Sequence, residues 1–333
     1  MKTTCLINSW NYRRHVGEAI ESALSQTVPF DKIVVVDDGS TDGSVEYLQS
    51  NFDGNPKVVV IPKPHGGQLS CFNRGIAEVR TELVCFLDAD DRYRPNYLES
   101  VIREYEQRPN VDFLSVSSVA FGANENCNSV RASCTRDRGF SVSGALLGSH
   151  WVGERTSCLS MRTSVARKVL PYPHESEWIT RADDVLVFGA SVVGAYKRHL
   201  NQGLVEYRVH EHNHFANQQF GDVVKFRRSV AINRLCGWFA EKMGYEISLL
   251  PDTLHREFRT CQKPTIREWW SYQKLSFSVS RSWAAVFRNM VTFSLHYANQ
   301  RLTSANQDIS PIEVETEGVP PLFQVDEPIA EAA

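Results

Sequence analysis

Short apolar runs that alternate with helical patterns constrain the fold of this chain more than any other feature. The runs at 3–7, 32–36 and 83–87 consist mainly of β-branched or other apolar residues, as expected for buried strands. Between them, segments 15–26 and 68–77 carry apolar side chains at helical spacing. Solid apolar strands joined by helices are typical of a parallel sheet that is covered on both faces. The sequence therefore predicts an α/β fold with a mostly parallel, Rossmann-like sheet.

Acidic side chains follow two of these expected strands directly. Asp37 and Asp38 come after the run at 32–36, and Asp88 and Asp90 come after the run at 83–87. In parallel sheets, ligands bind at the carboxyl ends of the strands. The sequence therefore predicts a binding site at this rim. A strand-to-helix turn and a solvated acidic turn are the alternative interpretations of the two motifs taken singly.

The motif CFLDADDRY places three carboxylates, those of Asp88, Asp90 and Asp91, within four residues. Carboxylates this close repel one another, so at least one resists ionisation unless a cation is present. Mg²⁺ and Mn²⁺ take oxygen ligands and leave positions for substrate phosphates. The motif therefore predicts a divalent metal site, with Mn²⁺ or Mg²⁺ as the cofactor.

Two further motifs could carry chemistry. The pair Asp183 and Asp184 opens an apolar helical pattern, where either carboxylate could act as a general base. The alternative is that both only cap the helix, because negative charge is favoured at a helix N-terminus. In VEYRVHEHNHF, His210 follows a strand and could ligate a metal or contact a diphosphate.

Taken together, these motifs resemble those of family 2 glycosyltransferases with the GT-A fold. The stretch CLINSWNYRRHVGEAIESALSQTVPFDKIVVVDDGSTDGS is similar to that family's opening, and HGGQLSCFNRGIAEVRTELVCFLDADD to its next segment. The resemblance covers about residues 3–100 closely and about 101–215 more loosely, through ADD and YRVHxxN. It implies an inverting transfer of a sugar from a nucleotide-diphospho-sugar to an acceptor hydroxyl.

The resemblance also implies roles for individual residues. Asp90 would be the direct metal ligand, with Asp88 and His210 beside it. Asp184 would be the catalytic base, although Asp183 stands where the family usually has Glu, so either could act. The residues implied in donor binding are Asn8, Trp10, Asp38, Asn73, Asp88 and Asp91.

The remainder of the chain divides by charge. We expect a catalytic domain over 1–220, a helical extension over 221–304 and an acidic, disordered tail over 305–333. Residues 225–302 hold 13 Lys and Arg against 5 Asp and Glu, a difference of +8, with interleaved tryptophans. This region predicts either a helical cap with a solvated basic face or a peripheral contact with an anionic membrane.

Whole-chain properties bound the remaining expectations. The formal net charge is -3, which gives no indication of a nucleic-acid partner. The eight cysteines form no CxxC pair and suggest buried free thiols in a reducing compartment. Without an apparent signal peptide or membrane span, a cytoplasmic location is expected, at the inner face of the membrane if the basic region binds lipid. The expected partners are a nucleotide-sugar donor and a carbohydrate, lipid-linked or other hydroxyl acceptor.

Two rival functions remain open at this point. A nucleotidyltransferase on a similar sheet would need a Gly-rich loop near the N-terminus to hold a triphosphate. Residues 8–17 offer Arg13, Arg14 and Gly17 but no Gly-rich run. A non-catalytic GT-A-like protein that binds sugar nucleotides would be expected to lose the metal or base carboxylates. Both sets of carboxylates are present in this sequence.

Overall fold

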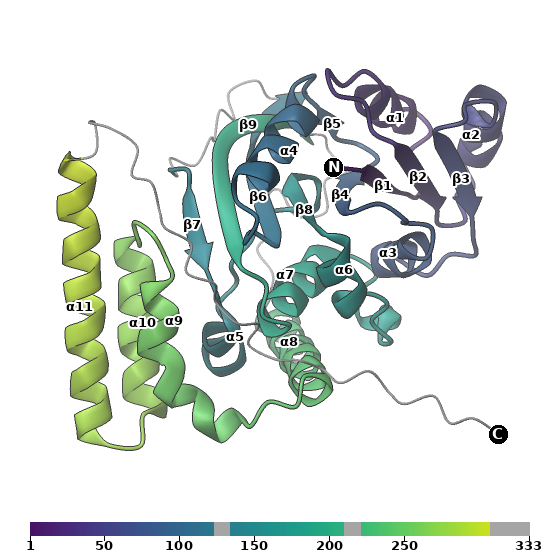
Figure 1. Cartoon of the computed structure of the whole chain (residues 1–333). Coiled ribbons are helices and arrows are strands. Elements are labelled where there is room, and N and C mark those ends of the chain that lie inside the picture. Colours follow the sequence, from purple (N-terminus) through teal and green to yellow (C-terminus); the bar gives the residue numbers. More distant parts are fainter. Residues whose placement is uncertain (123–133, 210–220, 307–333) are drawn as a thin grey trace, which may run out of the picture.

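The computed structural model describes residues 1–122, 134–209 and 221–306, and these form a mixed α/β structure (Figure 1). Within the described residues, nine strands build one sheet in the order β3-β2-β1-β4-β8-β6-β9-β5, and β7 pairs with β9. The predicted α/β class is confirmed. All three strand pairs at the β3 end of the sheet are parallel, namely β2–β3, β1–β2 and β1–β4.

The first part of the chain follows the predicted alternation of strands and helices. Every strand there is a short apolar run, and each helix between them returns the chain to the start of the next strand. The elements are β1 (Thr3–Ser9), α1 (Val16–Leu24), β2 (Lys32–Asp37), α2 (Ser44–Phe52), β3 (Val58–Pro62), α3 (Gln68–Ile76) and β4 (Leu83–Asp88).

The second part of the sheet is less regular, because antiparallel strands enter it. β8 runs antiparallel to both β4 and β6, and the long strand β9 pairs with β5, β6 and β7. α4 and β7 are not among the elements expected from the sequence. The elements are β5 (Arg92–Tyr93), α4 (Tyr97–Gln107), β6 (Phe113–Gly122), β7 (Arg136–Gly139), α5 (Val142–Gly148), β8 (Leu159–Arg162), α6 (Thr163–Val169), α7 (Ala182–Val192) and β9 (Lys197–Val209).

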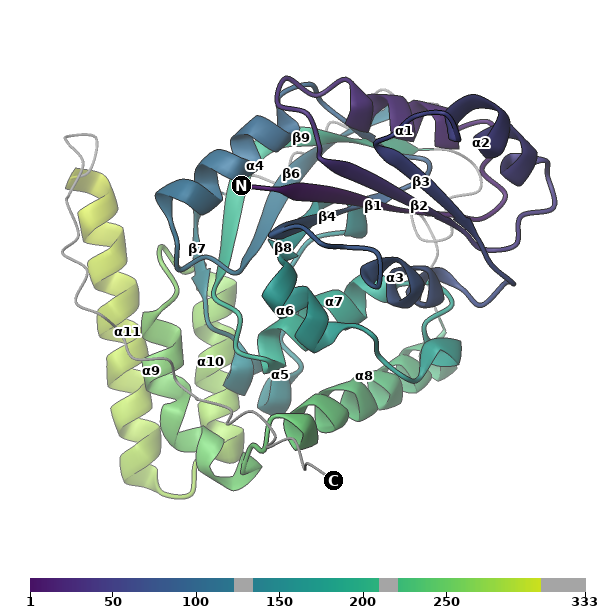
Figure 2. The same ribbon diagram turned by 45° about the vertical axis from the view of Figure 1, so that its right-hand side comes forward.

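Alternating side chains of the central strands point to opposite faces of the sheet and build two hydrophobic cores. In β2, Val34 and Val36 belong to one core, whereas Ile33 and Val35 belong to the other. Helices α3, α6 and α7 cover the first face, and α1, α2 and α4 cover the second (Figure 2). Two-sided burial explains why these strands are continuously apolar, as the sequence predicts.

Four helices follow the sheet: α8 (Asp222–Lys242), α9 (Leu254–Arg259), α10 (Ile266–Val279) and α11 (Trp283–Asn306). Leu235 and Phe239 of α8 are buried in the same core as α6 and α7. Helices α9, α10 and α11 form their own small core at the end of the sheet remote from β3 (Figure 1). The change of core therefore comes after α8, and the domain boundary predicted at residue 220 stays a prediction.

A buried carboxylate joins this helical group to the sheet domain. Glu257 of α9 accepts hydrogen bonds from the backbone N–H groups of Ser143 (2.6 Å) and Gly144 (2.8 Å), at the start of α5. It also accepts one from the hydroxyl of Tyr272 on α10, at 2.7 Å. This contact fixes the helical group against the helix α5 of the sheet domain. No helix among the described residues is long and apolar enough to cross a membrane.

Candidate active site

The carboxyl ends of β1, β2 and β4 lie side by side, because these three strands are adjacent and parallel. Asn8 of β1 is in register with Asp88 of β4, and Ser9 with Asp37 of β2. Sheet register therefore brings two acidic motifs that are about fifty residues apart in sequence to one rim. This is the rim at which the sequence predicts the site.

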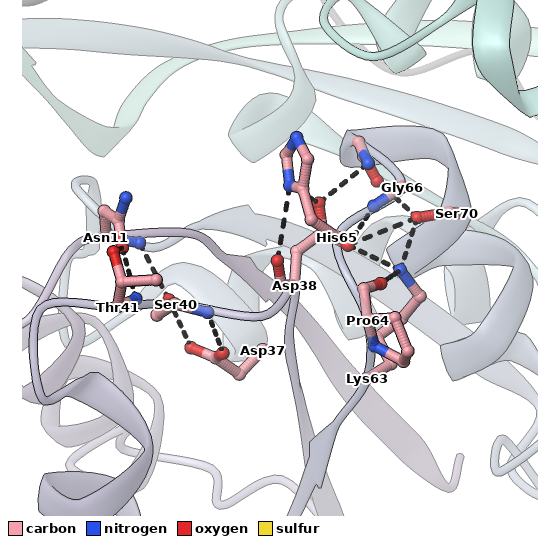
Figure 3. Close-up of polar contacts among 11 residues, drawn as sticks. Asn11, Asp37, Asp38, Ser40, Thr41, Lys63, Pro64, His65, Gly66 and Ser70 are labelled. Carbon is pink, nitrogen blue, oxygen red and sulfur yellow. Dashed lines mark hydrogen bonds and ion pairs between the residues drawn. The ribbon is translucent and has the colours of Figure 1, made fainter.

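Asp38 organises the loop between β3 and α3 (Figure 3). Its buried carboxylate accepts hydrogen bonds from the backbone N–H groups of Gly66 (2.9 Å) and Gly67 (2.7 Å), and it also pairs with Lys63 and His65. The neighbouring Asp37 instead accepts from the backbone N–H and hydroxyl of Ser40, which closes its own turn. The contacts of Asp38 therefore fix the Gly-Gly loop, and its predicted contact with a nucleoside stays a prediction.

Glycine is required at position 67 for two reasons. The residue has φ +90°, a conformation that costs a side-chain-bearing residue energy, and an added Cβ would lie 2.4 Å from Cα of Ile179. The backbone N–H of Gln68, the next residue, donates to the carbonyl of Ile179 at 2.8 Å. The loop before α3 is thus pressed against the segment that leads into α7.

Trp10 lies just beyond β1 and is 45% exposed, which is unusual for so large a side chain. Its ring stacks on the imidazole of His65, with centroids 4.5 Å apart and an interplanar angle of 27°. His65 is held in place by Asp38, so one face of the exposed indole packs on a fixed imidazole ring. An aromatic platform of this kind can stack a nucleobase.

Asp88 ends β4 in a crowded electrostatic environment. Its carboxylate accepts a hydrogen bond from Nε2 of Gln68 at 2.8 Å, and its backbone N–H donates to the hydroxyl of Ser157 at 3.1 Å. Burial, followed by the negative charges of Asp90 and Asp183, raises the pKa of Asp88 to about 7. The two motifs that the sequence keeps apart, DADD and ADD, are therefore in electrostatic contact.

Asp90 and Asp91 complete the acidic cluster. The hydroxyl of Ser157 donates to Asp91 at 2.6 Å and the backbone N–H of Arg208 at 2.9 Å, while burial raises the pKa of Asp91 well above its usual range. Tyr12 places its hydroxyl in hydrogen-bonding contact with Asp90, and burial together with the charge of Asp90 raises the pKa of Tyr12. The guanidinium of Arg208 also donates to the main-chain oxygen of Asp90, at 2.8 Å.

The two aspartates at the start of α7 have different surroundings. Asp184 is 0% exposed, and its carboxylate receives hydrogen bonds from Arg228 (both 2.9 Å) and Arg181 (3.1 and 3.4 Å). Asp183 is partly exposed, and burial of its carboxylate, followed by the charge of Asp184, raises its pKa to about 6. Asp183 is thus the less buried of the two residues, whereas Asp184 lies fully buried between two guanidinium groups.

Gln68 links Asp88 to the helix that carries these two aspartates. Its amide NH₂ group donates to Asp88, while its carbonyl oxygen accepts from the backbone N–H of Ala182, the first residue of α7, at 2.9 Å. One side chain thus sets the relative position of β4 and α7 at the site.

The structure does not bring every predicted residue into this group. The amide of Asn73 is used by another segment: it donates to the carbonyl of Tyr172 (2.8 Å) and to Glu175 (2.7 Å), and it accepts from the N–H of Tyr172 (2.9 Å). These bonds would have to break before Asn73 could contact a donor. His210, predicted as a metal ligand, lies outside the described residues. Among the described side chains, no three His, Cys, Asp or Glu residues form a group that could hold a metal ion alone.

Several site residues are absent from the sequence-based predictions, namely Tyr12, Gln68, Ser157, Arg208 and Arg228. Gln68 could have been noticed, because it is a polar residue at the start of a helix directly after two glycines. The contact between Arg228 and Asp184 spans 44 residues and leaves no local signal.

Comparison with known proteins identifies the family to which the chain belongs. Residues 4–170 match the family model of Glycosyl transferase family 2. The chain is 28% identical over 288 residues to an uncharacterized glycosyltransferase of Nostoc sp., an alignment that covers 83% of this chain and 88% of that protein. It is also 30% identical over 99 residues to chondroitin synthase of Pasteurella multocida, which is 30% of this chain and only 10% of the synthase.

The fold has a solved counterpart at low sequence identity. The chain is similar to residues 1–349 of S. aureus TarS, solved in complex with UDP-GlcNAc, with a TM-score of 0.59 and 15% identity over 92% of each chain. At this identity the likeness concerns the GT-A-like fold. The family match covers about half of the chain and includes the acidic motifs of β2 and β4. The chain therefore belongs to glycosyl transferase family 2 and is a glycosyltransferase.

Proposed function

We propose that this glycosyltransferase moves a sugar from a nucleotide-diphospho-sugar to an acceptor hydroxyl with inversion, and that Asp183 is its general base. The observation that carries the proposal is the bridge made by Gln68, because its hydrogen bonds to Asp88 and to the backbone N–H of Ala182 hold the start of α7, and with it Asp183, next to the donor-side cluster. A single displacement needs one base and no protein nucleophile, unlike a double displacement. The resemblance points to Asp184, but its two arginine partners and full burial favour Asp183.

The donor-side residues fit a divalent cation. Asp88 and Asp90 offer oxygen ligands, and their mutual repulsion contributes to the raised pKa of Asp88, which a bound cation would relieve. We propose that these two carboxylates hold Mn²⁺ or Mg²⁺ and that the donor's phosphates complete the coordination. Such a cation, when bound, offsets the negative charge that develops on the departing nucleoside diphosphate.

Other parts of the rim would position the donor. The exposed indole of Trp10 would stack the nucleobase, and the Gly-Gly loop held by Asp38 keeps His65 beneath that indole. Ser157 and the backbone of Arg208 hold Asp91 at the edge of the cluster, from where it would contact the donor sugar. Since TarS was solved with UDP-GlcNAc, UDP-sugars are the first donors to test.

A donor screen tests this proposal. The full chain is incubated with UDP-, GDP- and dTDP-sugars and Mn²⁺, release of nucleoside diphosphate is measured, and the anomeric configuration of the product is read by NMR. We expect turnover with one nucleotide class, an inverted product, and loss of turnover in Asp183→Asn but not in Asp53→Asn, an exposed control. A retained anomer contradicts inversion. Release of pyrophosphate from a nucleoside triphosphate would indicate a nucleotidyltransferase, and donor binding without turnover a non-catalytic protein.

We also propose that the C-terminal helices contact an anionic membrane. Trp283 (81% exposed), Phe287 (70%) and Leu295 (66%) share one face of α11, and the region 225–302 carries an excess of eight positive charges. Exposed aromatic and basic side chains on one helix suit the surface of anionic lipids. Sedimentation with anionic vesicles should fall in the double variant Trp283→Ser, Phe287→Ser and be weak with neutral vesicles. Unchanged sedimentation of the variant contradicts the membrane contact. The contact is also contradicted if the wild type is a dimer and the variant a monomer, because the exposed face then serves as a dimer interface.

A further inference from the structure

A cleft of about 610 Å³ opens where the segment before α7 meets the first turns of α8. Its lining combines arginines with apolar side chains that are unusually exposed: Phe226 is 70% exposed, Val224 49% and Val230 42%. None of these α8 residues is used by the donor-side machinery. The lining residues that matter here are Trp178, Arg181, Phe226, Arg227, Arg228 and Val230.

The cleft adjoins the proposed base. Arg181 and Arg228 line it, and both donate hydrogen bonds to Asp184, the residue that follows Asp183. The positive charges of Arg181 and Arg228 also act on Asp183, which in turn acts on Asp88. Asp183 is therefore within electrostatic reach of both the donor-side carboxylates and the arginines of the cleft. A hydroxyl held at Asp183 would leave the rest of its molecule free to enter the cleft.

The charge of the cleft selects the kind of molecule that can occupy it. Its lining carries three arginines and one glutamate, and Glu177 is already paired with Arg234. The carboxylates of Asp184 and Asp183 offset the charges of Arg181 and Arg228, so the excess positive charge of the lining is that of Arg227. Arg227 lies exposed on α8, between Phe226 and Arg228. Guanidinium groups bind phosphate and carboxylate strongly. A hydrocarbon chain that covers the exposed apolar side chains beside them removes apolar surface from water, which lowers the free energy of binding.

We propose that this cleft binds the acceptor and that the acceptor is an anionic amphiphile, with a phosphate or carboxylate on the arginines and a hydrocarbon chain on Phe226 and Val230. This inference rests on the proposed function, because it presumes that Asp183 takes the acceptor proton. It goes further by naming the chemical class of the acceptor. A neutral oligosaccharide would leave both the excess charge and the apolar surface unused.

A binding experiment with matched probes tests the class. Farnesyl phosphate, below its aggregation threshold, is titrated into the full chain by calorimetry and compared with farnesol and with inorganic phosphate. We expect farnesyl phosphate to bind at least about tenfold more tightly than either, since losing a charged hydrogen bond or the burial of an apolar group each costs about that factor. Equal binding of farnesol removes the anionic element of the proposal, and equal binding of inorganic phosphate removes the hydrocarbon element.

Variants locate the binding. Arg227→Gln and Phe226→Ser should each weaken farnesyl phosphate about tenfold, whereas Arg267→Gln and Phe277→Ser, exposed counterparts on α10, should not. Unchanged affinity in the first pair overturns the proposal. UDP-sugar binding is measured in the same samples. If the donor binds and turns over but the probe does not bind, only this inference fails, whereas undiminished turnover in Asp183→Asn removes the proposed base instead.

Discussion

The two sides of the active site hold their carboxylates in different ways. On the proposed donor side, Asp88 and Asp91 accept hydrogen bonds from neutral groups, namely the amide of Gln68, the hydroxyl of Ser157 and a backbone N–H. On the proposed acceptor side, Asp184 is held by two guanidinium groups, those of Arg181 and Arg228. Neutral donors stabilise a carboxylate but leave its charge in place, whereas guanidinium groups offset it.

This difference indicates where an external cation is needed. Burial and mutual repulsion raise the pKa values of Asp88 and Asp91, so the donor side is short of positive charge. The acceptor side supplies its own positive charge, which leaves Asp183 beside an already compensated Asp184. The comparison therefore supports the two proposals, that the metal binds on one side of the site and that the base lies on the other.

The largest effect should come from the base. Asp183→Asn is expected to lower kcat by about 10²–10⁴-fold, because a general base contributes that much. A base with a pKa of about 6 is charged above that pH and protonated below it, so wild-type kcat/KM should fall about tenfold per pH unit below pH 6. The acidic limb should disappear in Asp183→Asn. A variant that keeps both its turnover and its acidic limb would break the comparison on the acceptor side.

The metal should come next. Asp90→Asn, or chelation by EDTA, is expected to lower turnover by about 10³-fold, since a bound cation supplies several kcal/mol at the transition state. Donor affinity, measured by calorimetry, should depend on added Mn²⁺ in the wild type and lose that dependence in Asp90→Asn. Full donor affinity and turnover in EDTA would show that the donor side needs no cation.

The smallest of the three effects is on the stability of the fold. Asp184→Asn should destabilise the fold by about 2–4 kcal/mol, because it leaves Arg181 and Arg228 without their buried partner. This is somewhat below the cost for fully buried pairs, since both arginines reach solvent. Urea unfolding should show this loss for Asp184→Asn and almost none for Asp183→Asn. Equal losses would mean that the two carboxylates have similar structural roles.

The first half of the fold is readable from the sequence, because its strands are buried on both faces. The runs that become β1, β2 and β4 are recognisable because they are continuously apolar, and each acidic motif lies at the end of its strand. The start of β9 is not readable in this way. Lys197 is 1% exposed there, and its ammonium group donates to the carbonyls of Val152 and Val187 and to the hydroxyl of Ser191. From the sequence alone, a lysine at this position indicates an exposed loop, because the hydrogen bonds that allow its burial form only in the folded structure.

The choice between the two aspartates of α7 also lies beyond local sequence. Both lie in the first turn of the same apolar helix and have the same charge, so no sequence pattern separates them. They differ in tertiary contacts, because Asp184 is fully buried and is paired with Arg228 of the distant helix α8. In contrast, α4 could have been predicted, since Tyr97, Val101 and Tyr105 recur at helical spacing and are all buried.

The close approach of Gly67 to Ile179 has a consequence for engineering. A Cβ at position 67 would sit 2.4 Å from the backbone of Ile179, and the Gln68 amide spans the same junction to Ala182. The two loops therefore form one interlocking part, although a hundred residues of chain separate them. Chimeras that graft acceptor specificity from a relative should exchange both loops as a unit, because either one alone meets a mismatched surface.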